Sequence, residues 1–398
     1  MSSTSNEPVI LSAARTPVGS FQKSLGKFTA PQLGSIAIKE AVERAGIDAG
    51  LIDEVLMGQV LQGGSGQAPA RQAALGAGLP ETVSATTINK VCGSGLKTVM
   101  IAAGMVKAGD GSFFVAGGQE SMSSAPFILK TARSGMRLGH AEATDVLIGD
   151  GLWCAINDCH MGELAEYTAE KASLTREELD EFAAESQRKA AEAQEADKFK
   201  AEIVPVEIPQ RKGDPVYFSE DEYIRSETTS ESLGRLRPAF VKEGIVTAGN
   251  ASGINDGAAA IVVSSREAAE KAGVPVMARI TGYAQAHVDP KELFFAPIYA
   301  ARNLMEKTGT SIGDFDLIEA NEAFASQALA NGKELGWDWE RVNVNGGAIA
   351  IGHPIGASGA RVLTTLLYAL KDRGLKTGIA TLCLGGGGAV ALAVEIED

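Results

Sequence analysis

The stretch TGIATLCLGGGGAVALAV, residues 377–394, is a predominantly apolar run of 18 residues without a charged side chain. A membrane-spanning helix needs about 20 apolar residues, whereas this run is shorter and is interrupted by a row of glycines. Two short apolar segments on either side of a glycine turn are instead typical of two buried, adjacent strands. The stretch therefore predicts a strand pair inside a globular protein.

Upstream of this pair, short β-type runs alternate with helical ones. Strands are expected at residues 9–12, 55–60, 113–116, 258–264, 276–283 and 317–320, and helices at residues 31–45, 93–108, 298–306 and 323–335. The first of these helices has a proline near its start and Gly46 after its end, as helix termini prefer. This alternation predicts an α/β protein whose sheet is largely covered on both faces.

The segment 121–250 interrupts the alternation, because it is dense in charge and has few continuous apolar runs. Within it, Thr175 and Glu178 have the spacing of a capping box and predict a helix that reaches about residue 198. Three prolines between residues 205 and 215 then predict an extended, hairpin-like stretch. The segment is therefore expected to be an insertion into the first of two similar α/β halves.

Length and net charge limit the number of domains and the kinds of partner that the chain can have. A chain of 398 residues is long enough for two or three domains. Its formal net charge of −14 argues against nucleic acid or an anionic membrane as the main partner. Four cysteines do not make a disulfide scaffold, and the polar first residues do not read as a signal peptide, so a cytoplasmic location is expected.

The 46 glycines exceed the roughly 28 expected at a usual frequency of ~7 %, and they cluster. The clusters do not match phosphate-binding loops, since neither G-x-G-x-x-G nor G-x-x-x-x-G-K-[ST] occurs. The stretch GASGA at residues 356–360 misses the G-x-S-x-G elbow of serine hydrolases by its last residue. Dinucleotide-binding, P-loop and serine-hydrolase functions are therefore disfavoured.

Cys92 lies in NKVCGSGLK, between a strand-like stretch and a helix. A cysteine at a helix N-terminus meets the positive end of the helix dipole, which favours the thiolate. Glycines beside it allow a substrate to approach the backbone closely. Cys92 is therefore a candidate nucleophile, although a free cysteine is also often a small buried apolar residue.

Three further residues could serve a cysteine nucleophile. His353 is exposed by glycine and proline neighbours at a turn before a helix, and imidazole has the right intrinsic pKa for a base. Asn321 follows a strand, where it could cap a helix or hold a water at an oxyanion site. Cys383 closes the first strand of the buried pair, and the glycines after it could present backbone N–H groups to an oxyanion.

Cys154, Cys159 and His160 are close enough in sequence to suggest a metal site. No Cys or His cluster elsewhere completes a set of four ligands, so no metal is predicted.

Together with these candidate residues, eight stretches of the sequence match one protein family. The matching stretches are NKVCGSGLK (89–97), VAGGQESM (115–122), HMG (160–162), LRPAF (236–240), TAGNASGINDGAA (247–259), NEAFA (321–325), GGAIAIGHPIGASGAR (346–361) and CLGGGG (383–388). On these eight stretches the chain resembles the thiolase family over essentially its full length.

The resemblance implies an α/β thiolase fold. Two similar βαβαβαββ halves would form a layered α-β-α-β-α arrangement. The N-terminal domain would span residues 1–268, with an inserted loop domain at about residues 121–250, and the C-terminal domain would span residues 275–398.

The resemblance also implies the chemistry of an acetyl-CoA C-acetyltransferase, in which two acetyl-CoA and acetoacetyl-CoA plus CoA interconvert. Cys92 would be the acylated nucleophile, His353 would activate it, and Cys383 would be the acid/base for the acetyl α-proton and the leaving group. Asn321 would position a water that forms one oxyanion hole with His353. The backbone N–H groups of Cys92 and Gly385 would form the other.

In family members, the positions of Arg225, Ser252 and His160 contact coenzyme A or the substrate thioester. Coenzyme A thioesters would be substrates, with no separate cofactor and no metal. The resemblance further implies a homotetramer, built as a dimer of dimers. No nucleic acid or membrane partner is expected.

The sequence determines the size of the acyl group less clearly than it determines the family. HMG at residues 160–162 looks like the short-chain, acetoacetyl branch of the family, but LFF at residues 293–295 departs from many bacterial biosynthetic members. Gln187 stands where an animal mitochondrial branch has the tyrosine of a potassium site, so potassium is not predicted. A broad-range 3-ketoacyl-CoA thiolase of fatty-acid β-oxidation and a non-catalytic acyl-CoA-binding protein are the alternatives.

Overall fold

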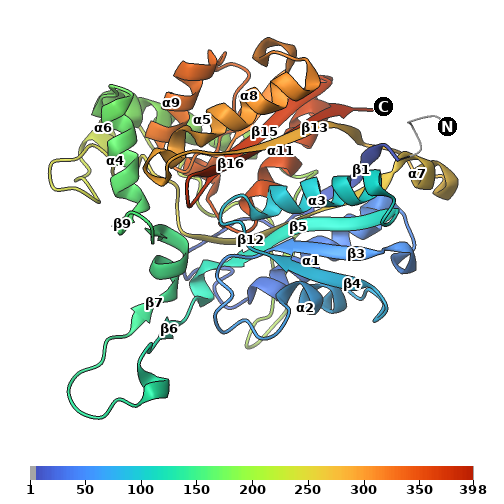
Figure 1. Ribbon diagram of the computed structural model, residues 1–398, viewed down its shortest axis with the longest axis horizontal. Helices are drawn as coiled ribbons and strands as arrows, with labels where there is room; N and C mark the ends of the chain where they lie inside the picture. The colour runs from blue at the N-terminus through green and yellow to red at the C-terminus, as the bar shows by residue number, and fades with distance from the viewer. Residues whose placement is uncertain (1–5, 398) are drawn as a thin grey trace.

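The computed structural model describes residues 6–397 and has two halves of the same design (Figure 1). The elements of the first half are β1 (Pro8–Arg15), α1 (Ala30–Ala45), β3 (Glu54–Gly58), α2 (Pro69–Gly76), β4 (Ser84–Ile88), α3 (Ser94–Ala108), β5 (Phe113–Ser121) and β12 (Asn255–Ser265). Its strands lie in the order β4-β3-β5-β12-β1. β3 is parallel to β4 and β5, whereas β12 is antiparallel to β5 and β1.

The second half repeats this plan with one strand reduced. Its elements are β13 (Ala278–His287), α8 (Ala296–Thr308), β14 (Leu317–Ala320), α9 (Ala325–Leu335), α10 (Ala348–Ile351), α11 (Ser358–Arg373), β15 (Thr377–Leu384) and β16 (Gly388–Ile396). The strand order is β14-β15-β16-β13, and Val342 forms a single parallel bridge to Ile318 where the first half has β4. The predicted βαβαβαββ halves are therefore present, with the third strand of the second half shortened to a bridge.

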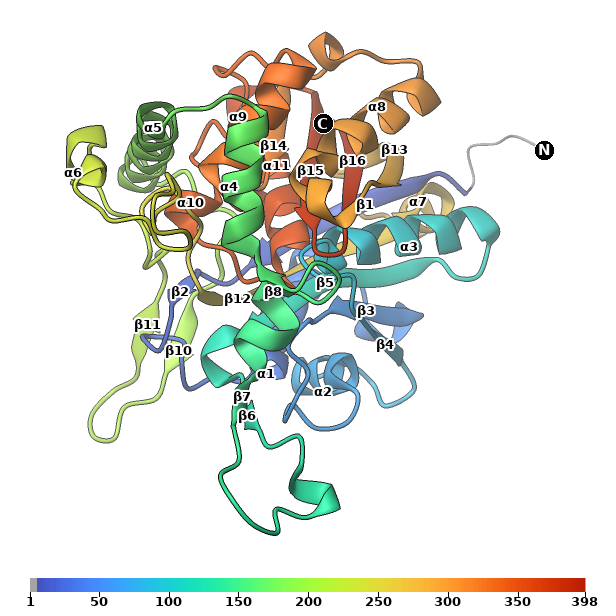
Figure 2. The same ribbon diagram turned by 60° about the vertical axis from the view of Figure 1, so that its left-hand side comes forward.

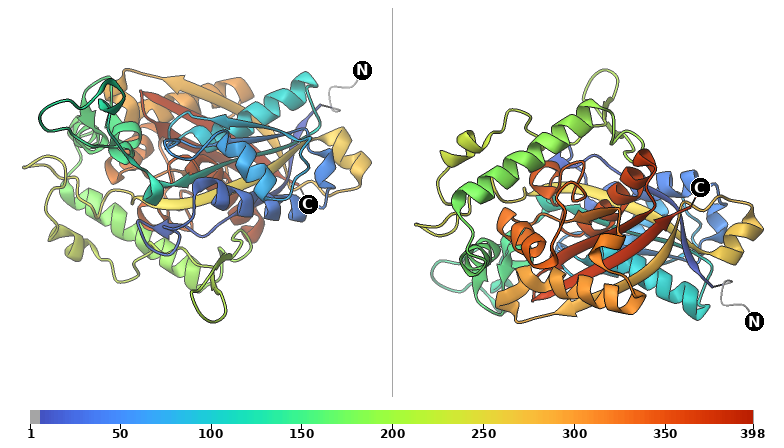
Figure 3. Two further views of the ribbon diagram at one scale, coloured as in Figure 1. Left: turned by 90° about the horizontal axis from the view of Figure 1, so that it is seen from below. Right: turned by 90° about the horizontal axis from the view of Figure 1, so that it is seen from above.

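The two half-sheets join where β1 pairs with β13, through Val9 opposite Arg279 and Ile10 opposite Ala278. α3 and α11 pack against each other and against strands of both half-sheets, so they form the central layer. α1 and α2 cover the outer face of the first half-sheet, and α8 covers that of the second (Figure 3). The five layers expected from the family resemblance are thus observed.

The apolar stretch near the C-terminus, residues 377–394, explains this layering. Residues 377–394 form β15 and most of β16, joined by a turn in which Gly386 and Gly387 have φ of 83° and 86°, which favours glycine. Along β16 the larger side chains Val390, Leu392 and Val394 face the central helices, whereas the alternating alanines face α8. Because strand side chains alternate between faces, one strand serves two apolar layers.

α3 lies within residues 91–108, the one segment of the described chain that is long and apolar enough to cross a membrane. It packs in the central layer against α11, β5 and β3. Its apolar character is accounted for by this double-sided burial.

The insertion between β5 and β12 forms a separate polar layer on one side (Figures 1 and 2). Its elements are β6 (Phe127–Ile128), β7 (Thr144–Asp145), β8 (Trp153–Cys154), β9 (Cys159–His160), α4 (Met161–Lys171), α5 (Arg176–Glu195), β10 (Val206–Ile208), β11 (Val216–Phe218) and α6 (Ser230–Gly234). The predicted capping box of Thr175 and Glu178 opens α5, which ends at Glu195, earlier than expected. The proline-containing stretch is the β10–β11 hairpin, while α4 was not predicted.

Candidate active site

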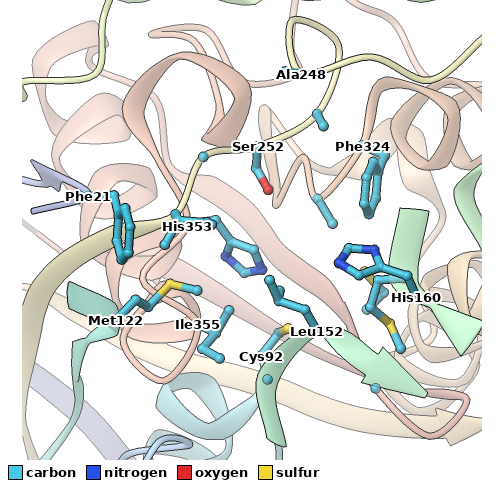
Figure 4. Close-up of a pocket in the computed structure, with 18 of the residues that line it drawn as sticks. Phe21, Cys92, Met122, Leu152, His160, Ala248, Ser252, Phe324, His353 and Ile355 are labelled. Carbon is cyan, nitrogen blue, oxygen red and sulfur yellow. The ribbon is translucent and has the colours of Figure 1, made fainter. Parts of the chain in front are cut away.

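A cavity of about 500 Å³ opens where both halves and the insertion meet. Cys92 comes from the first half, His353, Cys383 and Gly385 come from the second, and His160 comes from the insertion. In Figure 4 the rings of His353 and His160 and the side chain of Cys92 border the same space. The cavity therefore collects residues from almost the whole length of the chain, from Ser20 to Gly385.

Cys92 is presented by a strained turn before α3. Val91, just before it, has φ of 48°, an unusual conformation for a β-branched residue. The Asn89 side chain accepts a hydrogen bond from the Val91 N–H at 2.9 Å. The Ser94 hydroxyl accepts from Lys90 N–H and donates to Val91 C=O, both at 2.7 Å. The residues around the cysteine thus hold the turn that directs its thiol to the cavity.

The expected helix-terminus effect on Cys92 is outweighed in the free protein. Burial raises the pKa of the thiol to about 12, although hydrogen bonds from the backbone N–H groups of Cys92 and Gly385 act in the opposite direction. The resting side chain is therefore a neutral thiol that needs a proton acceptor. The two N–H groups at its sulfur are those that the family resemblance assigned to an oxyanion hole.

His353 is suited to accept that proton. Its Nδ1 lies 2.6 Å from the Ser358 hydroxyl, which donates its only proton to Pro354 C=O at 2.9 Å. Nδ1 must therefore carry the ring hydrogen, which leaves Nε2 as an acceptor. Burial, followed by the charge of Arg361, lowers the pKa of His353 to about 3, so the ring is neutral.

Cys383 and Asn321 occupy neighbouring strand ends. Cys383 is buried near the end of β15 and lines the cavity, and burial and the nearby Cys92 raise its thiol pKa. Asn321 follows β14, and its N–H donates to Thr381 C=O on β15 at 3.0 Å. Its side chain is fully buried and does not line the cavity directly, whereas the nearby Ala323 and Phe324 do. Within residues 6–397 neither polar atom of this amide has a hydrogen-bond partner.

The three residues expected to contact coenzyme A all line the cavity. Figure 4 shows the Ser252 hydroxyl directed into it. The guanidinium of Arg225 lies 5.1 Å from the centroid of the Tyr223 ring and supplies positive charge. His160 Nδ1 accepts the Gly162 N–H at 3.0 Å, so the neutral ring carries its hydrogen on Nε2 as a donor.

Two of the matching stretches meet at His160. Its ring stacks on Phe240 with centroids 4.9 Å apart. A Cβ at Gly162 would lie 2.1 Å from the Phe240 ring, so only glycine fits there. The stretches HMG and LRPAF therefore build one wall of the cavity together.

Of the residues that left substrate size open, Leu293 and Phe294 line the cavity and Phe295 does not. Phe294 packs edge-to-face on Phe324, with centroids 5.3 Å apart. Gln187 accepts a hydrogen bond from Arg225 N–H at 2.8 Å and donates to Ile349 C=O at 3.2 Å. Its amide thus links α5 to the loop that carries Arg225.

Sequence reasoning missed Lys23, Phe21 and Met122 as cavity-lining residues. It also missed Glu120, a buried carboxylate that accepts the N–H groups of Val60, Leu61 and Gly356 at 2.9–3.2 Å. Burial raises the pKa of Glu120 to about 7. Glu120 binds loops of both halves, which are far apart in the sequence. Its place in the stretch VAGGQESM was therefore the signal that could have identified it.

Comparison with known proteins gives a consistent result. Family models described as "Thiolase, N-terminal domain" and "Thiolase, C-terminal domain" match residues 8–267 and 274–396. The chain is 57 % identical to the acetyl-CoA acetyltransferase of Pseudomonas aeruginosa over 384 residues, which cover 96 % of this chain and 98 % of that protein. It is also 57 % identical to the acetyl-CoA acetyltransferase of Cupriavidus necator, with 97 % and 98 % covered.

A solved structure agrees over the whole length. The crystal structure of the Bacillus anthracis acetyl-CoA acetyltransferase superposes with a TM-score of 0.97 at 45 % identity, and 100 % of each chain is covered. Family models and relatives thus match nearly all of the sequence that builds both halves and the cavity between them. The chain belongs to the thiolase family and is an acyltransferase of that family.

Proposed function

We propose that this chain is an acetyl-CoA acetyltransferase that condenses two acetyl-CoA to acetoacetyl-CoA and CoA, and that also runs the reverse thiolysis. The proposal is supported by the printed activity of relatives at 54–57 % identity. The observation that carries it is the meeting of Cys92, His353 and Cys383 in one cavity, with the N–H groups of Cys92 and Gly385 at the nucleophile's sulfur.

In the first step His353 Nε2 takes the proton of the Cys92 thiol, and the sulfur attacks the thioester carbonyl of acetyl-CoA. The carbonyl oxygen becomes an oxyanion, which the N–H groups of Cys92 and Gly385 stabilise. Collapse of this intermediate breaks the bond to the CoA sulfur, which takes the proton of the Cys383 thiol and leaves as CoA, so that Cys383 becomes a thiolate and His353 keeps the proton of Cys92. Acetyl-Cys92 remains.

In the second step Cys383, as a thiolate, removes an α-proton from a second acetyl-CoA. The carbanion attacks acetyl-Cys92, a C–C bond forms, and the bond to the Cys92 sulfur breaks. A water held by Asn321 and His353 would stabilise the enolate oxygen of the second acetyl-CoA. Arg225, Ser252 and the Nε2–H of His160 would bind the coenzyme A thioester.

The first intermediate provides the test. Incubation with acetyl-CoA is expected to add one acetyl group to Cys92, detected by peptide mass spectrometry. Cys92→Ser should fold normally and lose turnover, while the control Cys154→Ser, outside the cavity, should still acetylate Cys92. A non-catalytic acyl-CoA-binding protein would bind acetyl-CoA without this adduct, and that result would overturn the proposal.

Acyl specificity needs a separate comparison. The bulky side chains of Leu293, Phe294 and Phe324 line the apolar part of the cavity, which supports a short acyl group. Thiolysis of acetoacetyl-CoA is expected to exceed that of a C8–C16 3-ketoacyl-CoA in kcat/KM. A preference for the long chain would instead identify a broad-range thiolase.

We also propose a cytoplasmic homotetramer. An arm between β6 and β7 extends from the body of the protein (Figure 2) and exposes Phe127, Leu129, Met136 and Leu138, which supports association with further copies of this chain. Sedimentation equilibrium should give the mass of four chains. Replacing these four side chains with serine should lower that mass.

A further inference from the structure

Cys154 and Cys159 belong to a short hairpin, and the mechanism uses neither of their thiols. β8 and β9 are antiparallel, and their register places Cys154 directly opposite Cys159 and Trp153 opposite His160. Directly opposed residues of an antiparallel pair point to the same face, with Cβ atoms about 4.5–5.5 Å apart. The two thiols therefore lie side by side, although the four residues 155–158 separate them along the chain.

This spacing is close to what a disulfide requires. A disulfide joins Cβ atoms about 3.5–4.5 Å apart, so the hairpin must contract only slightly. Both thiols are free in this structure. Among residues 6–397 no group of three or more His, Cys, Asp or Glu side chains is placed to hold a metal ion, which disfavours a metal at this pair.

The two cysteines differ in access and surroundings. Cys159 is half-buried beside the exposed loop 155–158, so a small molecule in solution can reach it. Cys154 is buried, and its sulfur accepts hydrogen bonds from Asn157 N–H and Nδ2, both at 3.4 Å. The more accessible Cys159 therefore meets an oxidant first, and the buried Cys154 is placed to attack the mixed disulfide from within the hairpin.

The hairpin also has a defined relation to the cavity. Leu152, just before β8, and His160, at the end of β9, both line the cavity wall. A covalent bond between residues 154 and 159 would fix the spacing of these two wall residues.

We propose that Cys154 and Cys159 are a redox-active pair that forms a reversible disulfide across the hairpin at the cavity wall, without participation of Cys92 or Cys383. The oxidant is a small-molecule disulfide such as oxidised glutathione.

The reaction is two thiol–disulfide exchanges. The Cys159 thiolate attacks one sulfur of the oxidant, its S–S bond breaks, and one reduced thiol leaves with a proton. The Cys154 thiolate then attacks the Cys159 sulfur of the mixed disulfide and expels the second reduced thiol. Two protein thiols are oxidised and one small disulfide is reduced to two thiols.

Asp158 lies between the two cysteines, so cleavage before this residue places them in different peptides. The full-length protein is equilibrated with oxidised glutathione, blocked with iodoacetamide, denatured, and cleaved before aspartate without reduction. Peptides 150–157 and 158–179 each contain one of the cysteines and separate unless a disulfide joins them. The expected product is the linked pair of peptides, which dithiothreitol converts to the two separate ones.

Three variants serve as controls. Cys92→Ser should give the same linked peptides, whereas Cys154→Ser should stop at a glutathione adduct on Cys159, and Cys159→Ser should give no linkage. A glutathione adduct without linkage in the unmodified protein would overturn the proposal, as would linkage to Cys92 or Cys383, or no reaction. None of these readouts depends on catalytic activity, so the proposal stands or falls independently of the acetyl-CoA reaction.

Discussion

His353 carries the clearest pH signature among individual residues. Its ordinary pKa is 6.5, and burial with the charge of Arg361 lowers it to about 3 in the folded protein. Between these values the unfolded chain binds a proton that the folded protein does not. The stabilisation associated with the neutral ring is therefore complete above pH 6.5 and is lost as the pH falls toward 3.

This predicts the difference between the unmodified protein and His353→Asn. On going from pH 8 to pH 5, the unmodified protein should lose on the order of 2 kcal/mol of unfolding free energy more than the variant does. Urea unfolding at both pH values measures this difference. Equal losses in the two proteins would show that His353 is protonated as readily when folded as when unfolded.

Cys383 is expected to separate the two half-reactions. Cys383→Ala removes the proposed proton carrier, so condensation of acetyl-CoA should fall about 100-fold or more. Acetylation of Cys92 should persist at a lower rate, because His353 still takes the Cys92 proton and the CoA sulfur can leave as a thiolate. Condensation by the variant at the full rate would refute the proton-transfer role.

The central helices α3 and α11 pack closely against each other. α3 and α11 meet at their first turns, where a Cβ at Gly359 would lie 2.3 Å from the Leu96 nitrogen. Backbone cannot move aside, so Gly359→Ala should lower the unfolding free energy by about 1–3 kcal/mol or more. Denaturant unfolding with urea measures this change.

Gly104, in the middle of α3, is the matched control. The nearest atom to its added Cβ is the Tyr283 hydroxyl at 3.5 Å, an ordinary contact. Gly104→Ala should therefore be neutral or stabilise by up to about 1 kcal/mol through helix propensity. Similar effects at both glycines would contradict the close crossing of the two helices.

At the scale of the whole molecule, the insertion is tied to the body by a buried charge cluster. Arg15 on β1 donates to Glu202 at 2.7 Å and to both oxygens of Asp221 at 2.7 and 2.9 Å, and all three side chains are buried. Arg15→Met should cost about 3–5 kcal/mol, because two carboxylates would remain buried without their partner. Thermal unfolding and limited proteolysis of the insertion would report this loss.

Arg188 provides the comparison for this prediction. It pairs with Glu185 and Glu192 on an exposed face of α5. Arg188→Met should therefore change stability by less than about 1 kcal/mol. A comparable loss in both variants would argue against the anchoring role of Arg15.

The sequence by itself determined the alternation of strands and helices, since apolar periodicity and helix-end residues are local signals. Residues 377–394 specified two strands and their turn, and the glycines around Cys92, His353 and Cys383 indicated close backbone approach. The candidate nucleophile and base came from short motifs, and their roles were implied by family resemblance. α4 was missed because its short polar sequence packs on α9 and on residues 290–295, which are distant in the chain.

Only the tertiary structure decided how these residues act on one another. The pKa of Cys92 rises although its helix terminus would lower it, because burial depends on neighbours from the other half of the chain. Lys23 lines the cavity from a loop near the N-terminus, and Glu120 on β5 binds loops of both halves; no local pattern marks such positions. The pairing of Cys154 with Cys159 depends on strand register, which a short polar hairpin specifies only weakly in its sequence.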